Sequence, residues 1–311
     1  MVAETEVATA RRSGRAARRR IRMTEARWAA VMLAPTALGL GVFYLWPVVQ
    51  TLYYSFTSWT GFGAHHWAGL ANYRRLMHDP ELGSALGHTV LYSALVLLGI
   101  PLALVLAAML NQPGMRGRTL YRVLYFLPVV TMPVAAAMMW RLLYNGDFGL
   151  INAGLKVVGI HGLSWTSDAR VALYALVIVG IWQVLGYNLV ILLGGLQAIP
   201  RELYEAAALD GAGPVKTFFR ITVPLLSPSV FFVSVISVIT TLQMFDLVYV
   251  MIGATNPALP NTRTIVYLFY DHGFVEGDRG YASAIVFLLL AIILALTAVQ
   301  FRLQRRWVHY G

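Results

Sequence analysis

Six apolar runs dominate this chain, and each is long enough to cross a lipid bilayer as a helix. They cover approximately 28–54, 86–110, 119–143, 171–196, 229–252 and 281–303. A spanning helix needs about 20 predominantly apolar residues, because the hydrocarbon core holds no water to satisfy free backbone groups. Charged residues make up only 12% of the chain, about half of the fraction typical of soluble domains. The sequence therefore predicts an all-α polytopic membrane protein with six transmembrane helices.

The segment 1–27 is strongly basic and precedes the first apolar run. It holds eight of the 24 Lys and Arg residues, but no aromatic residue is interleaved there and no recognisable nucleic-acid module follows. A secretory signal peptide is the alternative interpretation. However, the run 28–54 is longer than a signal h-region, and no clear cleavage site follows it. We therefore expect a cytoplasmic tail, a retained first span and no nucleic-acid partner.

The remaining basic residues predict the orientation in the membrane. Three Lys or Arg residues lie in or next to each of the segments 111–118, 197–228 and 304–311. Because cytoplasmic segments of membrane proteins carry an excess of Lys and Arg, we place these three segments and both termini in the cytoplasm. Residues 28–303 then form one six-helix domain, and the external segments are 55–85, 144–170 and 253–280.

The cytoplasmic segment 197–228 is a polar interruption between two spans. Pro200 suits the first turn of a short helix, where a missing N–H is harmless, and Glu202 and Glu205 lie near its positive end. Gly211 is the residue type that ends a helix in the left-handed conformation. A second helix, Val215 to Val223, is expected after this turn. The segment is thus a pair of helices that offers a surface to another protein.

The second of these helices carries no nucleotide site of its own. Pro214 opens it, and Pro224 is expected to bend or break it. Lys216-Thr217 looks like the end of a phosphate-binding loop, but Val215 occupies the position of the motif's last glycine and no strand precedes it. The chain has no cysteine, and its seven histidines lack the spacing of metal ligands. We therefore predict no catalytic residue, no metal site and an energy source on another chain.

Polar side chains inside the spans are few. The fourth span carries Gln183, Tyr187 and Asn188, and the fifth carries Ser237, Thr240, Thr241 and Asp246. Such residues usually face the bundle interior or a water-filled path, and hydroxyls and amides beside an aromatic ring suit a neutral polyhydroxylated ligand. The alternative is interhelical hydrogen bonding, worth about 0.6 kcal/mol per contact. For Asp246 the alternative to a ligand contact is an ion pair with Arg141 or Arg170, which we favour.

Several local motifs carry a resemblance to a known family. Glu205-Ala206-Ala207, Asp210-Gly211-Ala212, Ile221 and Pro224 resemble the EAA loop of bacterial ABC importer permeases. Three further segments resemble the sugar-importer branch of these permeases, which includes the maltose and glycerol-phosphate types. They are Leu196 to Pro200, Phe245-Asp246-Leu247 and Gly280 to Ala284.

The resemblance implies a type I importer permease in the bacterial cytoplasmic membrane. Its implied partners are a second homologous permease, two ATPase subunits that bind ATP and Mg, and an external solute-binding protein. This chain itself would hold no cofactor. The residues implied in coupling to the ATPases are Glu205, Ala206, Ala207, Asp210, Gly211 and Pro224. For the solute path the resemblance points to three positions in the fourth span, Gly180, Gln183 and Tyr187. It also points to Ser237, Thr240 and Thr241 in the fifth span.

The nature of the solute stays open at this point. A mono- or oligosaccharide is the first expectation, since no span centre carries a basic residue for an anion. The alternative within transport is a phosphorylated polyol such as a glycerol phosphodiester. A membrane receptor that signals through the loop 197–228 without moving solute is the third hypothesis.

Overall fold

The structure is a computed structural model that describes residues 28–61, 63–112 and 117–308, and the basic tail expected at 1–27 lies outside them. The chain divides into two compact units, Met1–Tyr54 and Ser55–Gly311. In the first unit one apolar helix begins at Trp28 and is long enough to cross a membrane. It contains a π-helical turn, η1 (Gly41–Leu45), followed by α2 (Trp46–Ser55).

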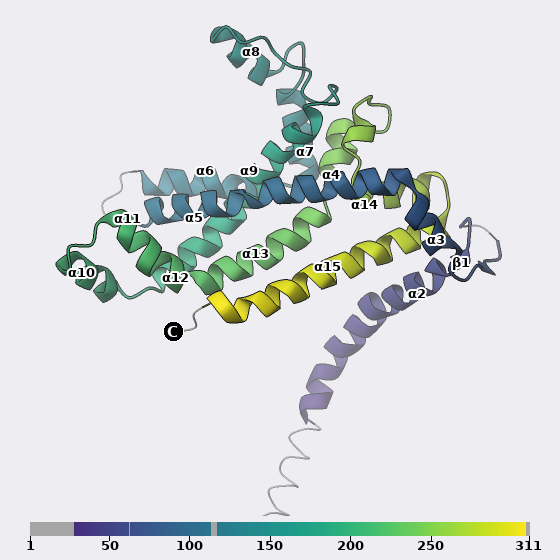
Figure 1. Cartoon of the computed structure of the whole chain (residues 1–311), viewed down its shortest axis with the longest axis horizontal. Coiled ribbons are helices and arrows are strands. Elements are labelled where there is room, and N and C mark those ends of the chain that lie inside the picture. Colours follow the sequence, from purple (N-terminus) through teal and green to yellow (C-terminus); the bar gives the residue numbers. More distant parts are fainter. Residues whose placement is uncertain (1–27, 62, 113–116, 309–311) are drawn as a thin grey trace, which may run out of the picture. The chain divides into compact units, whose positions relative to one another are not determined.

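The second unit is organised around one long apolar helix, α9 (Ala172–Gln197) (Figure 1). Its neighbours are α4 (Pro80–Leu97), α5 (Gly99–Leu110), α6 (Arg118–Val130) and α13 (Ser227–Leu242). Leu176, Leu189 and Leu192 on α9 are fully buried, because helices surround it on several sides. α15 (Arg279–Trp307) packs against α13. α9 and α15 cover the ranges expected for the fourth and sixth spans.

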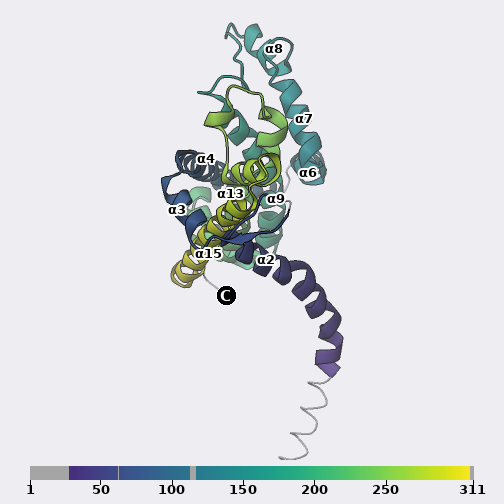
Figure 2. The same cartoon turned by 90° about the vertical axis from the view of Figure 1, so that its right-hand side faces the viewer.

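The range 119–143, expected to be a single span, is broken in the structure. α6 ends at Val130, α7 (Pro133–Leu143) begins after two non-helical residues, and the two helices meet at 113°. Met132 has an extended backbone with ψ of 132°, as the residue before a proline prefers, and Pro133 then starts a new helix. Both views show α7 and α8 (Leu150–Val157) extending away from the long helices (Figures 1 and 2).

The range 229–252 also departs from one continuous helix. α13 ends at Leu242, and after a break at 243–245 the chain is helical again from Asp246 into the π turn η3 (Val248–Ile252). The described chain therefore holds four helices that could cross a membrane, or up to six if each of two bent helix pairs forms one span.

Short elements gather where α4 begins, opposite the loop 197–228. β1 (Thr57–Ser58) pairs antiparallel with β2 (His66–Trp67), and α3 (Ala71–His78) leads to Asp79, which caps α4. Arg75 on α3 forms a 2.6 Å ion pair with Asp278 just before α15. The predicted external segment 253–280 contains η4 (Leu259–Asn261), α14 (Ile265–Tyr270) and η5 (Asp271–Val275).

Asp79 joins α4 to α15 through both of its carboxylate oxygens. Oδ1 accepts hydrogen bonds from the N–H of Glu81 at 2.8 Å and of Leu82 at 3.4 Å, and Oδ2 accepts one from the Tyr281 hydroxyl. Burial alone would raise the pKa of Asp79, but these three hydrogen bonds together hold it below the ordinary value. The carboxylate form is therefore favoured by folding.

Candidate coupling loop and solute path

The first helix of the loop, α10 (Arg201–Leu209), ends in a glycine cap. Gly211 has a φ of 72°. Its N–H donates to the Ala208 carbonyl at 3.1 Å, and the N–H of Ala212 donates to the Ala207 carbonyl at 2.9 Å. This is the Schellman arrangement, in which a left-handed residue allows the last carbonyls of a helix to be satisfied. The turn expected at Gly211 is present.

The second helical segment runs from Pro214 to Leu225 and passes through Pro224, where the sequence predicts a bend or break. It consists of α11 (Pro214–Thr217), the π turn η2 (Phe218–Thr222) and α12 (Val223–Leu225). In an α-helix the proline ring would meet the carbonyl four residues earlier, and a π turn directly before the ring changes that geometry. The bend falls at Leu226 instead, where the segment meets α13 at 68°.

One side-chain contact joins the two helices on the inner side of the loop. The Tyr204 hydroxyl of α10 lies 3.3 Å from Oγ1 of Thr222 in η2. Thr222 and Ala207 are both buried, so the faces that carry them are turned into the unit. The loop therefore has an inner face turned towards the bundle and an exposed outer face.

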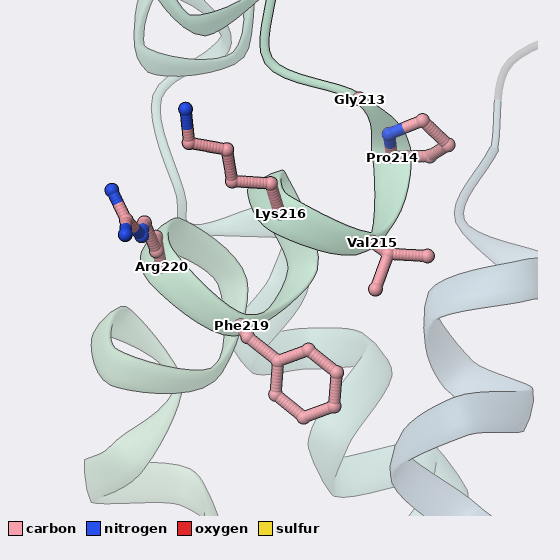
Figure 3. A pocket seen from close by; sticks show the side chains of 6 residues that line it. All are labelled: Gly213, Pro214, Val215, Lys216, Phe219 and Arg220. Atoms are coloured by element: carbon pink, nitrogen blue, oxygen red, sulfur yellow. The ribbon is translucent and has the colours of Figure 1, made fainter.

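The outer face combines charged and apolar side chains. Ala206 and Asp210 are exposed, and Leu209 at the end of α10 is 89% exposed. Lys216 and Arg220 extend in the same direction from the second helical segment, while Val215 and Phe219 extend elsewhere (Figure 3). The residues shown there line a shallow, open hollow of about 510 Å³. The exposed side of the loop therefore presents both apolar and charged groups, and these charges form no salt bridge among the described residues.

A larger cavity separates the loop from the bundle. It measures about 1010 Å³ and lies between the end of α5, the end of α9 and the inner side of the loop. Its lining includes the polar side chains of Gln112, Gln197 and Arg201. Glu205 is exposed and also lines this cavity. Since close packing resists displacement, a loop that stands partly clear of the bundle is suited to movement as a body.

The residues expected along the solute path divide into two groups by exposure. Tyr187 on α9 is 41% exposed. Thr240 on α13 is also exposed, and Gln183 is half-buried. These three side chains therefore reach a surface of the unit.

The other path candidates serve packing within the unit. Asn188 and Ser237 are buried, with Asn188 Nδ2 3.3 Å from Ser237 Oγ, so they join α9 to α13. Thr241 donates from Oγ1 to the Ser237 carbonyl at 2.8 Å. At Gly180 a Cβ would fall on the Tyr92 hydroxyl oxygen and 2.9 Å from Val96 Cγ2. This glycine allows α4 to approach α9 closely.

Asp246 has neither of the ion pairs that the sequence favours. It is exposed, and within the described ranges it takes part in no salt bridge. Arg141 donates from Nη1 to the Val250 carbonyl at 3.2 Å, and Arg170 pairs with Asp168 at 3.2 Å. The expected pairing is therefore wrong, because α7 and the segment after it direct both arginines to other acceptors.

Sequence reasoning missed the basic pair on the outer face of the loop. Lys216 and Arg220 are four residues apart, which places them on one side of a helix, and this spacing was a usable signal. It also missed the contact between Trp140 of α7 and Trp182 of α9, whose ring centroids lie 5.7 Å apart. No sequence signal joins these two tryptophans, because their approach depends on the bend between α6 and α7.

Residues 99–309 match the family described as "Binding-protein-dependent transport system inner membrane component". This chain belongs to that family. It is also 34% identical over 285 residues to the sn-glycerol-3-phosphate transport system permease protein UgpA of Pectobacterium atrosepticum, with 90% of this chain and 95% of the relative covered. The protein of the same name from Brucella abortus is 35% identical with the same coverage. The family prediction is confirmed.

The permease fold is shared with a solved bacterial transporter. A chain of the alginate ABC transporter, solved in complex with an alginate pentasaccharide-bound periplasmic protein, aligns with a TM-score of 0.81 and 21% sequence identity. The alignment covers 93% of this permease and 97% of the other chain. The protein is thus an integral membrane permease of the binding-protein-dependent ABC importer class.

Proposed function

We propose that this permease forms, with a second homologous permease, the path by which a bacterial cytoplasmic membrane imports a small polyhydroxylated solute. Two ATPase subunits, which bind ATP and Mg, engage the loop of α10 and α11, and an external binding protein delivers the solute. That loop carries the proposal, because it is a capped helix pair joined by the contact of Tyr204 with Thr222. Its charged side chains form no salt bridge among the described residues. Closure of the ATPases would move the loop and change the side on which the path opens.

The relatives favour a phosphorylated polyol over a sugar as the transported solute. A phosphorylated polyol such as sn-glycerol 3-phosphate becomes the first candidate, because the relatives that cover 90% of this chain are permeases of that transport system. A sugar is the second candidate. The exposed Tyr187 ring beside Gln183 favours it, because an aromatic face and an amide suit a sugar ring and its hydroxyls.

Reconstituted transport tests the coupling role. The full complex in liposomes should take up solute with ATP, and Glu205→Ala should lower that uptake at least about tenfold, because loss of one buried interface charge costs 2–5 kcal/mol. The matched control is Glu202→Ala, one turn earlier on the same exposed helix, which should keep most of the uptake. Full uptake by the Glu205→Ala complex would remove the proposed coupling role. ATP hydrolysis unaffected by any loaded binding protein would favour the receptor hypothesis.

A further inference from the structure

We infer that a polar recess beside η3 is a second solute-binding site, which takes a small phosphorylated polyol by its phosphate group. The recess measures about 320 Å³ and lies between the end of α7, the loops on either side of α8 and the segment after η3. None of its lining residues belongs to the coupling loop or to the path candidates on α9 and α13. The inference rests on the proposed transport function and specifies its substrate.

The recess presents one cation and a group of unused hydrogen-bond donors. Arg141 donates from Nη1 to the Val250 carbonyl at 3.2 Å, which positions the guanidinium and leaves its other N–H groups available. The hydroxyls of Ser164, Thr166 and Ser167 line the same recess, and none of the hydrogen bonds found among the described residues involves them. A guanidinium with nearby hydroxyls matches the oxygen atoms of a phosphate.

The walls of the recess are held by local hydrogen bonds. Asn145 Oδ1 accepts from the N–H of Asp147 at 2.9 Å and of Phe148 at 3.1 Å. Asn152 Nδ2 donates to the carbonyls of Gly146 at 3.0 Å and Leu163 at 2.9 Å, which ties together the loops on either side of α8. A site ordered before binding loses less entropy when the ligand arrives.

Aromatic rings support the inner side of the recess. Tyr144 stacks on Trp165 with centroids 5.4 Å apart, and its hydroxyl donates to the Ala175 carbonyl at 3.2 Å. Burial raises the pKa of Tyr144 to about 12, so this group stays neutral and does not repel an anion. Trp140 contacts both Tyr144 and Trp182. These ring contacts connect the wall of the recess at Tyr144 to α9 through Trp140.

Asp147 on the rim distinguishes between possible ligands. It forms no ion pair with Arg141 among the described residues, so both charges remain available. The carboxylate opposes bare inorganic phosphate but accepts hydrogen bonds from polyol hydroxyls. A neutral sugar would leave the guanidinium without an anionic partner. A solute with a phosphate at one position and hydroxyls at others satisfies both residues.

Direct binding tests the site. The full chain, co-purified with its second permease in nanodiscs, is titrated with radiolabelled sn-glycerol 3-phosphate, and glycerol and inorganic phosphate serve as competitors. Arg141→Gln should weaken binding at least about tenfold, because a charge-assisted hydrogen bond is lost, and Arg141→Lys should retain part of it. Arg170→Gln is the control, since Arg170 is exposed, pairs with Asp168 and does not line the recess.

The inference is overturned if the wild-type permease does not bind the phosphorylated polyol, or if Arg141→Gln binds it normally. Equal competition by glycerol would also overturn it, because the phosphate would then contribute nothing. Uptake by the reconstituted complex separates this site from the proposed function. If wild-type and Arg141→Gln complexes import the polyol equally well, only the site fails, whereas no ATP-driven uptake by the wild type contradicts the function itself.

Discussion

Gly180 shows how one missing side chain sets the distance between two helices. Gly180→Ala would place a methyl group against the Tyr92 hydroxyl and Val96 of α4. Both neighbours are buried, so they have little room to move. We expect a loss of about 1–3 kcal/mol in stability, as is usual for an overpacked core. Thermal unfolding of the purified permease in detergent measures this loss.

The same helix offers a matched control for this prediction. At Gly194 of α9 a Cβ would meet nothing within 4 Å, so Gly194→Ala should be neutral or slightly stabilising, as alanine favours a helix. Adding Tyr92→Phe to Gly180→Ala removes the hydroxyl that the methyl group meets, and part of the stability should return. If Gly180→Ala and Gly194→Ala unfold at the same temperature, the close-packing role of Gly180 is wrong.

The sequence identifies the polar residues inside the spans as a group, but it does not predict which of them are exposed and which are buried. Tyr187 and Asn188 are neighbours on α9, yet Tyr187 is exposed and Asn188 is buried against Ser237. Adjacent residues on a helix point about 100° apart, so their roles depend on where α13 lies. That position follows from tertiary packing, which one sequence does not contain.

At the level of elements, the length of the apolar runs and the position of glycine predict several helices and helix ends. α9 and α15 follow from uninterrupted apolar runs, and the end of α10 follows from Gly211. The sequence leaves open whether Pro133 marks a bend, and it predicts a bend or break at Pro224, where the helix continues instead. A proline either breaks a helix or is accommodated in it by a π turn. Which of the two occurs depends on how the neighbouring helices pack.

The cap of α4 makes a pH-dependent contribution to stability. The pKa of Asp79 is lowered by hydrogen bonds to its carboxylate, so its stabilisation is present above the ordinary Asp value of about 3.9 and is lost as the pH falls through the lower folded-state value. Asp79→Ala should destabilise the permease by about 1 kcal/mol at pH 7. Thermal unfolding at pH 7 and at a series of pH values below about 3.9 measures both effects.

Asp79→Asn separates the cap from the charge. Asparagine caps a helix about as well as aspartate, so this variant should keep most of the stability at pH 7. It should also lose the part of the acid sensitivity that Asp79 causes. An Asp79→Asn permease with the acid sensitivity of the wild type would show that another group is responsible.

For the whole molecule, the orientation in the membrane decides whether the loop and the recess face different compartments. The proposed function requires the loop of α10 and α11 to meet ATPases in the cytoplasm, and it requires the recess beside η3 to meet solute from outside. The charge distribution predicts this arrangement. The two sites lie on one unit, so a single orientation must satisfy both.

Cysteine labelling tests the orientation without background, because the natural chain contains no cysteine. Leu209→Cys on the coupling loop and Val157→Cys on α8 introduce thiols at side chains that are 89% and 87% exposed. A membrane-impermeant maleimide should label Val157→Cys in intact cells, and it should label Leu209→Cys only after the membrane is opened. Because exposure is nearly equal, a difference in labelling reports the side of the membrane. Labelling of both positions in intact cells would contradict the cytoplasmic loop, and with it the proposed coupling to ATP hydrolysis.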